Sequence, residues 1–275
     1  MNFRISAAAR THVGRIRTNN EDNFYLQDHI RKDVDQKNAE YHGDWKASRF
    51  LAAVADGMGG EAQGEMASLM TVEALKPCRL EGIEEAARTA IERANREICS
   101  EIEKNGGRRM GSTLAALYID DGKARCCNIG DSRVYLLRKG RFTRLSTDHN
   151  KAGRMVELGV LTPEQAARHP SRHELTQHLG IFEEEMVLEP AFGEPVTLQE
   201  GDVFLLCSDG LTDMVPEAAI AACLSREAPP EEQTESLVQL ALDGGGRDNV
   251  TALVVQINEA RPSLWKRLLM LGKDE

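Results

Sequence analysis

The sequence predicts an α+β fold, with strands and helices grouped in separate stretches of the chain. Between residues 112 and 145, short apolar runs are separated by Asp-Gly or Lys-Gly, a pattern typical of an antiparallel meander. Residues 61–76 and 83–104 instead carry apolar side chains at helical spacing, which predicts two successive amphipathic helices. Grouped strands and paired helices together indicate sheets that are covered by helices.

The remaining segments are assigned from the same patterns. Residues 29–48 are polar and irregular, and we expect an exposed loop there. Residues 150–180 predict short helical pieces with little strand character. No internal repeat and no long Gly-, Ser- or Pro-rich linker divides the chain. Two apolar runs predict strands and two segments between them predict helices: VFLLCS (203–208), VTALVVQI (250–257), 216–225 and 231–242.

The charge balance of the 275 residues limits the classes of function. The chain carries 34 Lys and Arg against 44 Asp and Glu, which gives a net charge of −10. A nucleic-acid-binding protein normally has a basic face, so this composition argues against a nucleic-acid partner. An acidic chain fits a metal site built from carboxylates better.

Targeting and redox signals point to one compartment. The N-terminal MNFRISAAAR lacks the apolar core of a signal peptide, and no apolar stretch is long enough to span a bilayer. The six cysteines show neither a CxxC pair nor the spacing of a disulfide framework. We therefore expect a cytoplasmic protein with no transmembrane segment.

Acidic residues recur where predicted strands begin or end: Glu21, Asp22, Asp56, Asp131, Asp209, Asp213 and Asp248. Any one of them could be part of an ordinary turn. If several strand ends converge, however, two carboxylates about 4 Å apart repel each other by roughly 4 kcal/mol at an effective dielectric of ~20. A cation must then neutralise them, and all-oxygen ligands favour Mg²⁺ or Mn²⁺ over zinc.

Six motifs occur in the order and rough spacing of one protein family: RTNNED, ADGMGG, GSTLAAL, GDSRVY, CSDGLTD and RDNVT. Together they resemble the metal-dependent protein phosphatases (PPM type, or type 2C serine/threonine protein phosphatases), in a form similar to bacterial members. The match runs from about residue 3 to 257. A single Asp-Gly pair would carry little weight, but six motifs in order are a specific signal.

The resemblance implies a four-layer sandwich of two antiparallel β-sheets flanked by helix pairs. Residues 1–258 would form the phosphatase domain, in which a flap over about 150–190 borders the active site and influences substrate choice. Residues 259–275 would form a short basic and apolar C-terminal tail. Such a tail could lie on a membrane or dock a partner, but packing on its own domain is the favoured expectation.

The same resemblance implies two Mn²⁺ or Mg²⁺ ions and, in bacterial-type members, a third. Asp56 would bridge two ions, and the carbonyl of Gly57 would be a further ligand. Asp209 and Asp248 match direct ligands, and Asp131 with Asp209 matches the third-metal site. The loop that follows Asp56 is not a Walker phosphate cradle, because no Lys-Ser/Thr follows its glycines.

Three other residues receive roles from the resemblance. Glu21 and Asp22 match the acidic pair that holds metal-bound waters. Arg17 matches the arginine that grips the substrate phosphate, a task that suits a guanidinium fork. The catalytic set that follows is Arg17 and Asp56.

The implied reaction is hydrolysis of phosphoserine and phosphothreonine in proteins by a metal-activated water. Phosphorylated protein substrates and a cognate Ser/Thr kinase system would be the partners. Two other functions stay open: a catalytically weak pseudo-phosphatase that binds phosphoproteins, and a small-molecule phosphoesterase. The complete acidic set argues against the first of these.

The sequence departs from the family where a histidine would protonate the leaving group. Eukaryotic members often have His at the position of Met58, and many bacterial members have it at Glu61. A metal-bound water or Glu61 is left as the proton donor, and a bound water is the favoured expectation. His169 and His173 have the spacing of a metal-binding pair on a helix, but Pro170 interrupts that helix, so we expect no second metal site there.

Overall fold

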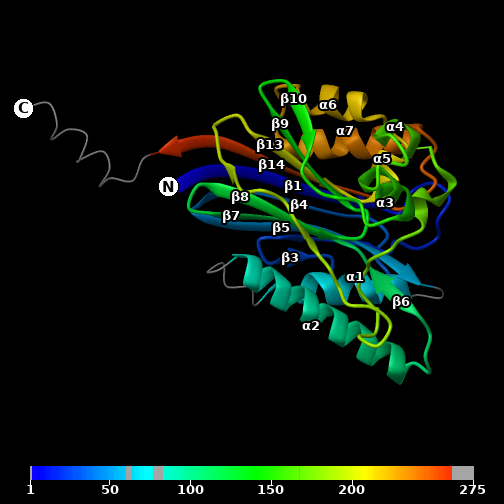
Figure 1. The fold of residues 1–275 in the computed structure, drawn as a ribbon. Coiled ribbons are helices and arrows are strands. Elements are labelled where there is room, and N and C mark those ends of the chain that lie inside the picture. Colours follow the sequence, from blue (N-terminus) through cyan, green and yellow to red (C-terminus); the bar gives the residue numbers. More distant parts are fainter. Residues whose placement is uncertain (1, 60–62, 77–82, 167, 262–275) are drawn as a thin grey trace, which may run out of the picture.

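Two β-sheets stacked face to face form the centre of the fold, and helices cover their outer faces (Figure 1). The computed structural model describes residues 2–59, 63–76, 83–166 and 168–261. In Figure 1 the layers follow one another from α6 and α7, through the two sheets, to α1 and α2. This arrangement confirms the predicted α+β class and the four-layer sandwich that the resemblance implied.

The first sheet contains six strands within the described residues, and all neighbouring strands are antiparallel. Their order across the sheet is β10 (Arg141–Arg144), β9 (Arg133–Arg138), β13 (Val203–Cys207), β14 (Val250–Arg261), β1 (Asn2–His12) and β4 (Ala39–Ala47).

The second sheet is also antiparallel, and its described part has eight strands. Its main order is β11 (Ala191–Phe192), β8 (Lys123–Ile129), β7 (Leu114–Asp120), β5 (Arg49–Gly59), β2 (Asp22–Leu26) and β3 (His29–Ile30). The two short additional strands are β12 (Val196–Thr197) beside β8 and β6 (Met110–Ser112) beside β5.

The helices fall into two covering pairs and a group of short segments. The four helices predicted from sequence periodicity are all present, and residues 150–180 contain the expected short pieces. The covering helices are α1 (Gln63–Glu73), α2 (Ile83–Lys104), α6 (Glu217–Leu224) and α7 (Pro230–Asp243). The short segments are α3 (Lys151–Glu157), α4 (Pro163–Ala166), the 3₁₀ helix η1 (Pro170–His173) and α5 (Asp209–Thr212). None of the helices within the described residues is long and apolar enough to cross a membrane.

Three apolar cores lie between the four layers. Because successive side chains of a strand point to opposite faces of its sheet, each central strand contributes residues to two of these cores. On β14, Leu253 and Val255 lie in the core between the sheets, whereas Val250 and Val254 pack with helix residues of α5–α7. On β7, Leu117 faces the central core and its neighbours face α1 and α2. Both sheets are therefore buried on both faces.

The prediction of an exposed loop over residues 29–48 is confirmed for residues 32–38, which are mostly exposed, but it is wrong for residues 39–47, which form a strand. Strand β4 in this segment pairs with β1 from Ala47↔Phe3 to Ala39↔Thr11. Its inward face is carried by alternate residues, of which Tyr41 and Trp45 pack against the central core. The other inward residues are alanine and glycine, so the alternation is too weakly apolar to be recognised from sequence.

The apolar runs of residues 112–145 form two hairpins in different sheets rather than one meander. Strands β7 and β8 pair in the second sheet, and β9 and β10 pair in the first. The chain crosses between the sheets at Gly130, whose φ is +99°, and a Cβ there would lie 2.6 Å from Cγ2 of Thr113. Glycine is required for this crossing, which delivers Asp131 to the end of the sandwich where the strands carry their acidic residues.

The C-terminal strand extends beyond the predicted end of the domain at residue 258. Strand β14 continues to Arg261 and pairs there with Asn2. The rest of the predicted tail, residues 262–275, lies outside the described residues.

A buried arginine fixes the loop that follows β3. Arg31 is 2 % exposed, and its guanidinium donates hydrogen bonds of 2.6–3.3 Å to five carbonyl oxygens. These acceptors belong to Asn20, Asp22, Asp33, Val34 and Gln36. The guanidinium therefore joins the start of β2 to the 31–38 loop.

We expect Arg31→Met to lower the free energy of unfolding by about 3 kcal/mol or more, because buried carbonyls lose their partners. The matched control is Arg49→Met, which removes an exposed ion pair with Asp120 and should cost about 1 kcal/mol or less. Urea denaturation of both variants measures the difference. Equal losses would show that the Arg31 network contributes no more than a surface pair.

Candidate active site

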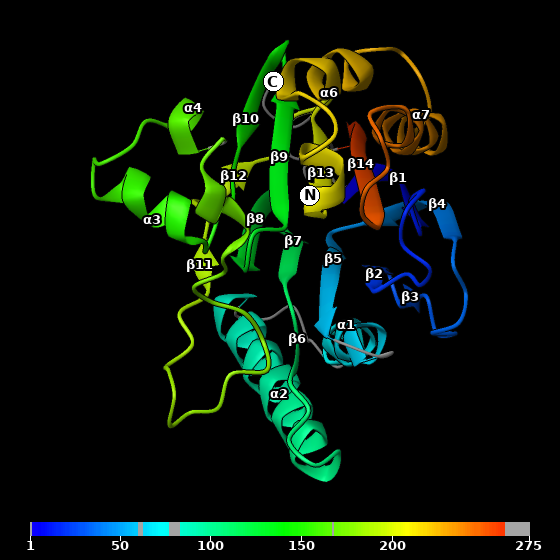
Figure 2. The same ribbon diagram turned by 90° about the vertical axis from the view of Figure 1, so that its right-hand side faces the viewer.

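The acidic strand ends come together at one end of the sandwich, the end that faces the viewer in Figure 2. In the second sheet, Asp22 at the start of β2 and Asp56 near the end of β5 are directly paired in the strand register. The amide of Gly57 donates a 3.1 Å hydrogen bond to the carbonyl of Glu21. The β2–β5 ladder thus places three of the predicted residues, and the predicted Gly57, side by side.

The first sheet brings its own acidic residues to the same place. Asp209 follows β13 and opens α5, and Asp248 precedes β14. The two strands are neighbours, and the amide of Ser208 donates to the carbonyl of Thr251 at 3.2 Å. Asp209 and Asp248 therefore lie at adjacent strand ends, as the convergence argument required.

The side chain of Asp22 joins the two sheets. It is fully buried, and its Oδ2 accepts hydrogen bonds of 2.7 Å from both Ser208 Oγ and Thr251 Oγ1 of the opposite sheet. Its second oxygen, Oδ1, is buried with no hydrogen-bond partner among the described residues. A buried carboxylate oxygen without a partner is costly, so this atom fits a site that is completed by a cation or by its water.

Electrostatics at the site disfavour the charged carboxylates. Burial, together with the negative charges of Asp209 and Asp248, raises the pKa of Asp22 to about 7. Burial and the neighbouring carboxylates raise the pKa of Asp56 well above its usual value. Burial and Asp209 raise the pKa of Asp131 to about 8. These shifts are the expected result of several carboxyl groups sharing one buried site, and bound cations would reverse them.

Glu21 has a separate neighbour. Burial and the negative charge of Glu65 raise the pKa of Glu21 to about 7. The side-chain amide of Asn19 donates to Glu65 Oε1 at 2.6 Å and approaches Glu21 Oε1 at 3.4 Å, so it lies between the two carboxylates. Glu65, on α1, is a site neighbour that the sequence reasoning did not select.

Close backbone approach explains the glycines of this region. A Cβ on Gly57 would lie 1.9 Å from the carbonyl oxygen of Gly64, and one on Gly64 would lie 2.5 Å from the Glu21 side chain. The end of β5 and the start of α1 can therefore approach each other and Glu21 this closely only with glycine at these positions. Residues 60–62 lie outside the described part of the chain, and they include Glu61, the alternative to a metal-bound water as proton donor.

Arg17 lies at the cleft as predicted, in the loop between β1 and β2. Its Nη2 donates to Asp248 Oδ2 at 2.8 Å, and its side chain is about half exposed. The guanidinium is therefore anchored on one side and open to the cleft on the other.

The predicted residues line one cleft of about 760 Å³, except Asp22, which lies buried behind them. The lining also includes Met58, the position at which eukaryotic members of the resembled family often have histidine. The predicted lining residues are Arg17, Glu21, Asp56, Gly57, Asp131, Asp209 and Asp248.

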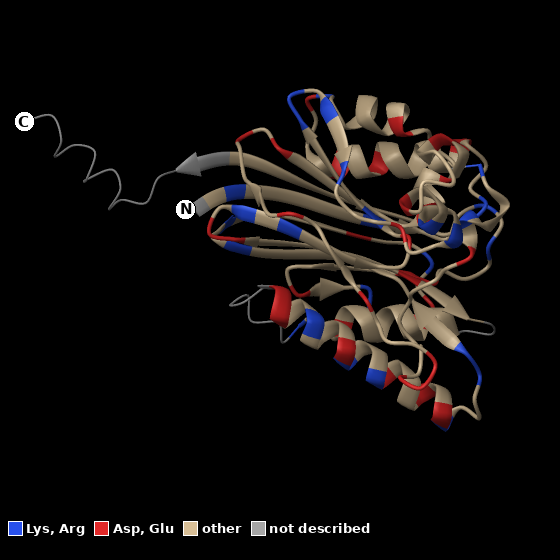
Figure 3. Ribbon diagram, viewed as in Figure 1, with Lys and Arg blue, Asp and Glu red and all other residues tan. Residues whose placement is uncertain are grey.

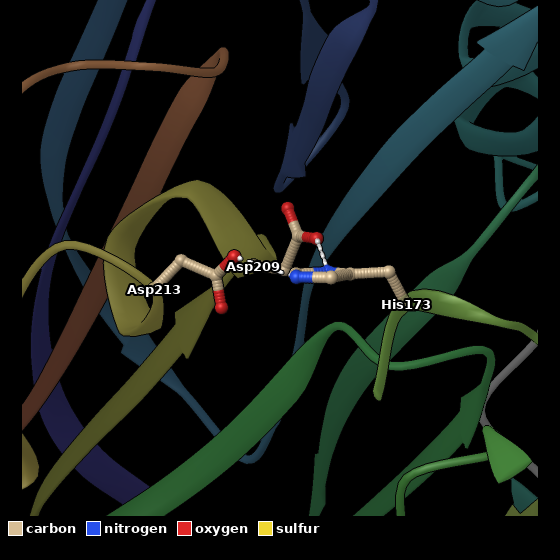
Figure 4. Close-up of side chains that lie close together, drawn as sticks. All are labelled: His173, Asp209 and Asp213. Atoms are coloured by element: carbon tan, nitrogen blue, oxygen red, sulfur yellow. Dashed lines mark ion pairs between the residues drawn. The ribbon is translucent and has the colours of Figure 1, made fainter. Parts of the chain in front are cut away.

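The HPSRH segment contributes to the cleft in a way that the sequence did not indicate. His173 Nδ1 lies 3.7 Å from Asp209 Oδ2, and its Nε2 lies 3.4 Å from Asp213 Oδ2 (Figure 4). The nearby carboxylates of Asp209 and Asp213 raise the pKa of His173. Arg172 adds a 3.3 Å ion pair with Asp213. His169 instead accepts from the amide of Ser171 and caps η1, so the two histidines have different structural roles.

Ligand atoms of His173, Asp209 and Asp213 all lie within 4.8 Å of one another. The two ring nitrogens, however, face different carboxylates, and Nε2 already accepts a 2.8 Å hydrogen bond from Arg172 Nε. Asp213 was visible in the CSDGLTD motif, whereas nothing in the sequence linked His173 to it.

Comparisons with known proteins agree with this geometry. The sequence pattern of the family described as protein phosphatase 2C matches residues 27–242. Protein phosphatase PhpP of Streptococcus pneumoniae is 34% identical over 256 residues, which cover 90% of this chain and 96% of that protein.

Two solved structures are similar over nearly the whole chain. The serine/threonine phosphatase PstP/Ppp of Mycobacterium tuberculosis superposes with a TM-score of 0.77 at 32% identity, covering 93% of this chain and all of that one. A PstP catalytic domain in complex with 2 manganese ions gives a TM-score of 0.75 at 31% identity and the same coverage of this chain.

The raised carboxyl pKa values predict how the metal-free protein responds to pH. Between about pH 4 and pH 8 the folded chain holds protons that the unfolded chain has released, so the free energy of unfolding falls as pH rises. We expect a loss of about 2 kcal/mol or more between pH 5 and 8 in EDTA. Urea denaturation at a series of pH values measures it.

Saturating Mn²⁺ serves as the control, because cations compete with these protons and should remove the decline. A flat profile in EDTA would contradict the description of the cluster.

Proposed function

The chain belongs to the protein phosphatase 2C family, and from this premise we propose which of its residues perform the reaction. It is a metal-dependent serine/threonine protein phosphatase that acts on phosphorylated proteins and requires divalent metal ions. The roles of single residues, the identity of the ions and the cellular partners are the subject of the proposal.

We propose that the acidic cluster holds two Mn²⁺ or Mg²⁺ ions. Asp56, the carbonyl of Gly57, Asp209 and Asp248 would be the direct ligands, and Asp131 with Asp209 would hold a third ion. The observation that carries this proposal is the set of converging buried carboxyl groups with raised pKa values, beside an unpartnered carboxylate oxygen. The oxygen-only donor set favours hard cations, and one solved relative holds two manganese ions.

The bound ions would supply a Lewis acid that makes a water nucleophilic near neutral pH and stabilises charge at phosphorus. The chain's own residues position the reactants. Arg17, anchored by Asp248, offers the free side of its guanidinium to the substrate phosphate. Asp22, held by Ser208 and Thr251, keeps one oxygen directed to the cluster without rotating.

The leaving serine or threonine alkoxide needs a proton. Met58 lines the cleft and cannot supply one. Glu61 stays a candidate from the sequence, with a metal-bound water as the favoured donor.

We propose that residues 1–258 act as one catalytic domain and that residues 150–190 form its flap. Three contacts support this role, because Arg172 reaches Asp213 and His173 reaches both Asp209 and Asp213 at the acidic cluster. Flap position and the state of the acidic cluster would then depend on each other.

We propose a cytoplasmic location and a Ser/Thr kinase system that supplies the substrates. The compartment rests on the cysteines, because the five that are described are all free thiols: Cys99, Cys126, Cys127, Cys207 and Cys223. A phosphatase of this class needs a kinase to generate its phosphoproteins.

Replacing a ligand tests the metal assignment. We expect Asp56→Asn and Asp209→Asn each to lower Mn²⁺-dependent hydrolysis of p-nitrophenyl phosphate and of phosphothreonine peptides by about 100-fold or more. The metal-free variants should unfold at the same or a higher temperature, because each removes repulsion from the cluster.

Asp120→Asn is the matched control, since Asp120 ends β7 outside the cleft. Near-normal activity of either ligand variant would show that the metal assignment is wrong. Activity on small phosphate esters without activity on peptides would instead favour a small-molecule phosphoesterase, and peptide binding without turnover would favour a pseudo-phosphatase.

The phosphate grip is tested by Arg17→Ala. A charged hydrogen bond to phosphate acts in ground and transition states alike, so KM should rise by about 10-fold or more while kcat changes less. The KM of Arg17→Lys should lie between those of the native protein and Arg17→Ala, because lysine keeps the positive charge but lacks the two-pronged guanidinium. An unchanged KM for a phosphothreonine peptide would remove Arg17 from the phosphate site.

A further inference from the structure

Three arginines line the catalytic cleft within the described residues, and two of them already have carboxylate partners. Arg17 pairs with Asp248 and Arg172 pairs with Asp213. The third, Arg247, is exposed and has no ion pair or hydrogen bond of its side chain to any described residue. Figure 3 shows Lys and Arg segments among Asp and Glu segments at this end of the sandwich.

The backbone that carries Arg247 is held firmly on both sides. Before it, the amide of Arg15 donates a 2.7 Å hydrogen bond to the carbonyl of Gly246. After it, the side-chain amide of Asn249 donates to the carbonyls of Val13 and Asn19 at 2.9 and 2.8 Å. The backbone at Arg247 is therefore fixed, whereas its guanidinium has no partner among the described residues.

The neighbouring carboxylates explain why Arg247 has no partner among the described residues. Asp248, the next residue, gives its Oδ2 to Arg17, and Asp243 pairs with Arg15 at 3.2 Å. Asp248 and Asp243 thus each already have an arginine partner. Arg247 is therefore available to an anion that enters this cleft, and the molecule that enters it is the phosphorylated substrate.

We propose that Arg247 binds an acidic side chain of the substrate close to the phosphorylated residue, so that the enzyme prefers phosphopeptides with Asp or Glu in that flank. The inference rests on the proposed function, since it takes the Arg17 side of the cleft as the place where the phosphate binds. Arg247 and Arg17 line the same cleft, and Asp248, which anchors Arg17, is the residue that follows Arg247. A guanidinium fork matches a carboxylate.

The expected preference is modest, because the pair forms at an exposed site. Exposed ion pairs change affinities by about 1.4- to 5-fold, and salt reduces the effect. A Glu-flanked phosphothreonine peptide should therefore exceed its Ala-flanked twin by about 3- to 5-fold in kcat/KM at low ionic strength.

The test uses full-length protein with Mn²⁺ and phosphothreonine peptides that carry Glu, Ala or Lys at one position, from three residues before the phosphothreonine to three after it. The variants are Arg247→Ala, Arg247→Lys and Arg247→Glu. Arg226→Ala is the matched control, because Arg226 is exposed and lies outside this cleft. The ratio of kcat/KM between peptides is measured for each protein at low and high salt.

The proposal predicts a Glu preference at one or two positions in the native chain that decreases with salt. Arg247→Ala should bring the ratio to about one, Arg247→Lys should retain part of it, and Arg247→Glu should favour the Lys peptide. Arg226→Ala should keep the native ratio.

A native ratio of one at every position would overturn the proposal, and so would an unaltered Glu preference in Arg247→Ala. If the Ala-flanked peptides are not hydrolysed at all with Mn²⁺, the proposed function itself fails, which distinguishes the two cases.

Discussion

A single buried carboxylate connects the architecture to the chemistry. Asp22 belongs to one sheet and accepts both of its hydrogen bonds from hydroxyls of the other. This fixes the distance between the sheets at the end where the acidic residues lie, and it leaves one oxygen without a partner. The negative charge that the fold concentrates there is unfavourable without cations, which is the physical basis for the proposed metal site.

Much of this site could be predicted from the sequence, because strand ends are recognisable. Asp56, Asp209 and Asp248 each adjoin an apolar run that the structure shows as a strand. Periodicity alone could not show that these ends converge, since convergence depends on how two sheets stack. The ordered motifs supplied that step through their resemblance to a known family.

The features that were missed have physical reasons. The inward side chains of strand β4 are partly alanine and glycine, so its apolar alternation is weak. Its neighbour β1 is rich in alanine. The crossing at Gly130 depends on one positive φ, which looks like an ordinary turn in the sequence. His173 reaches Asp209 from a segment of short helices, a tertiary contact that no local pattern encodes.

The central claim is that buried carboxyl groups keep protons until metal ions displace them. Isothermal titration of the metal-free protein with Mn²⁺ at pH 6.5, in buffers of different ionisation enthalpy, measures binding and proton release together. The account predicts Mn²⁺ binding with release of about one proton or more per protein. Binding without proton release, or no binding at all, would contradict it.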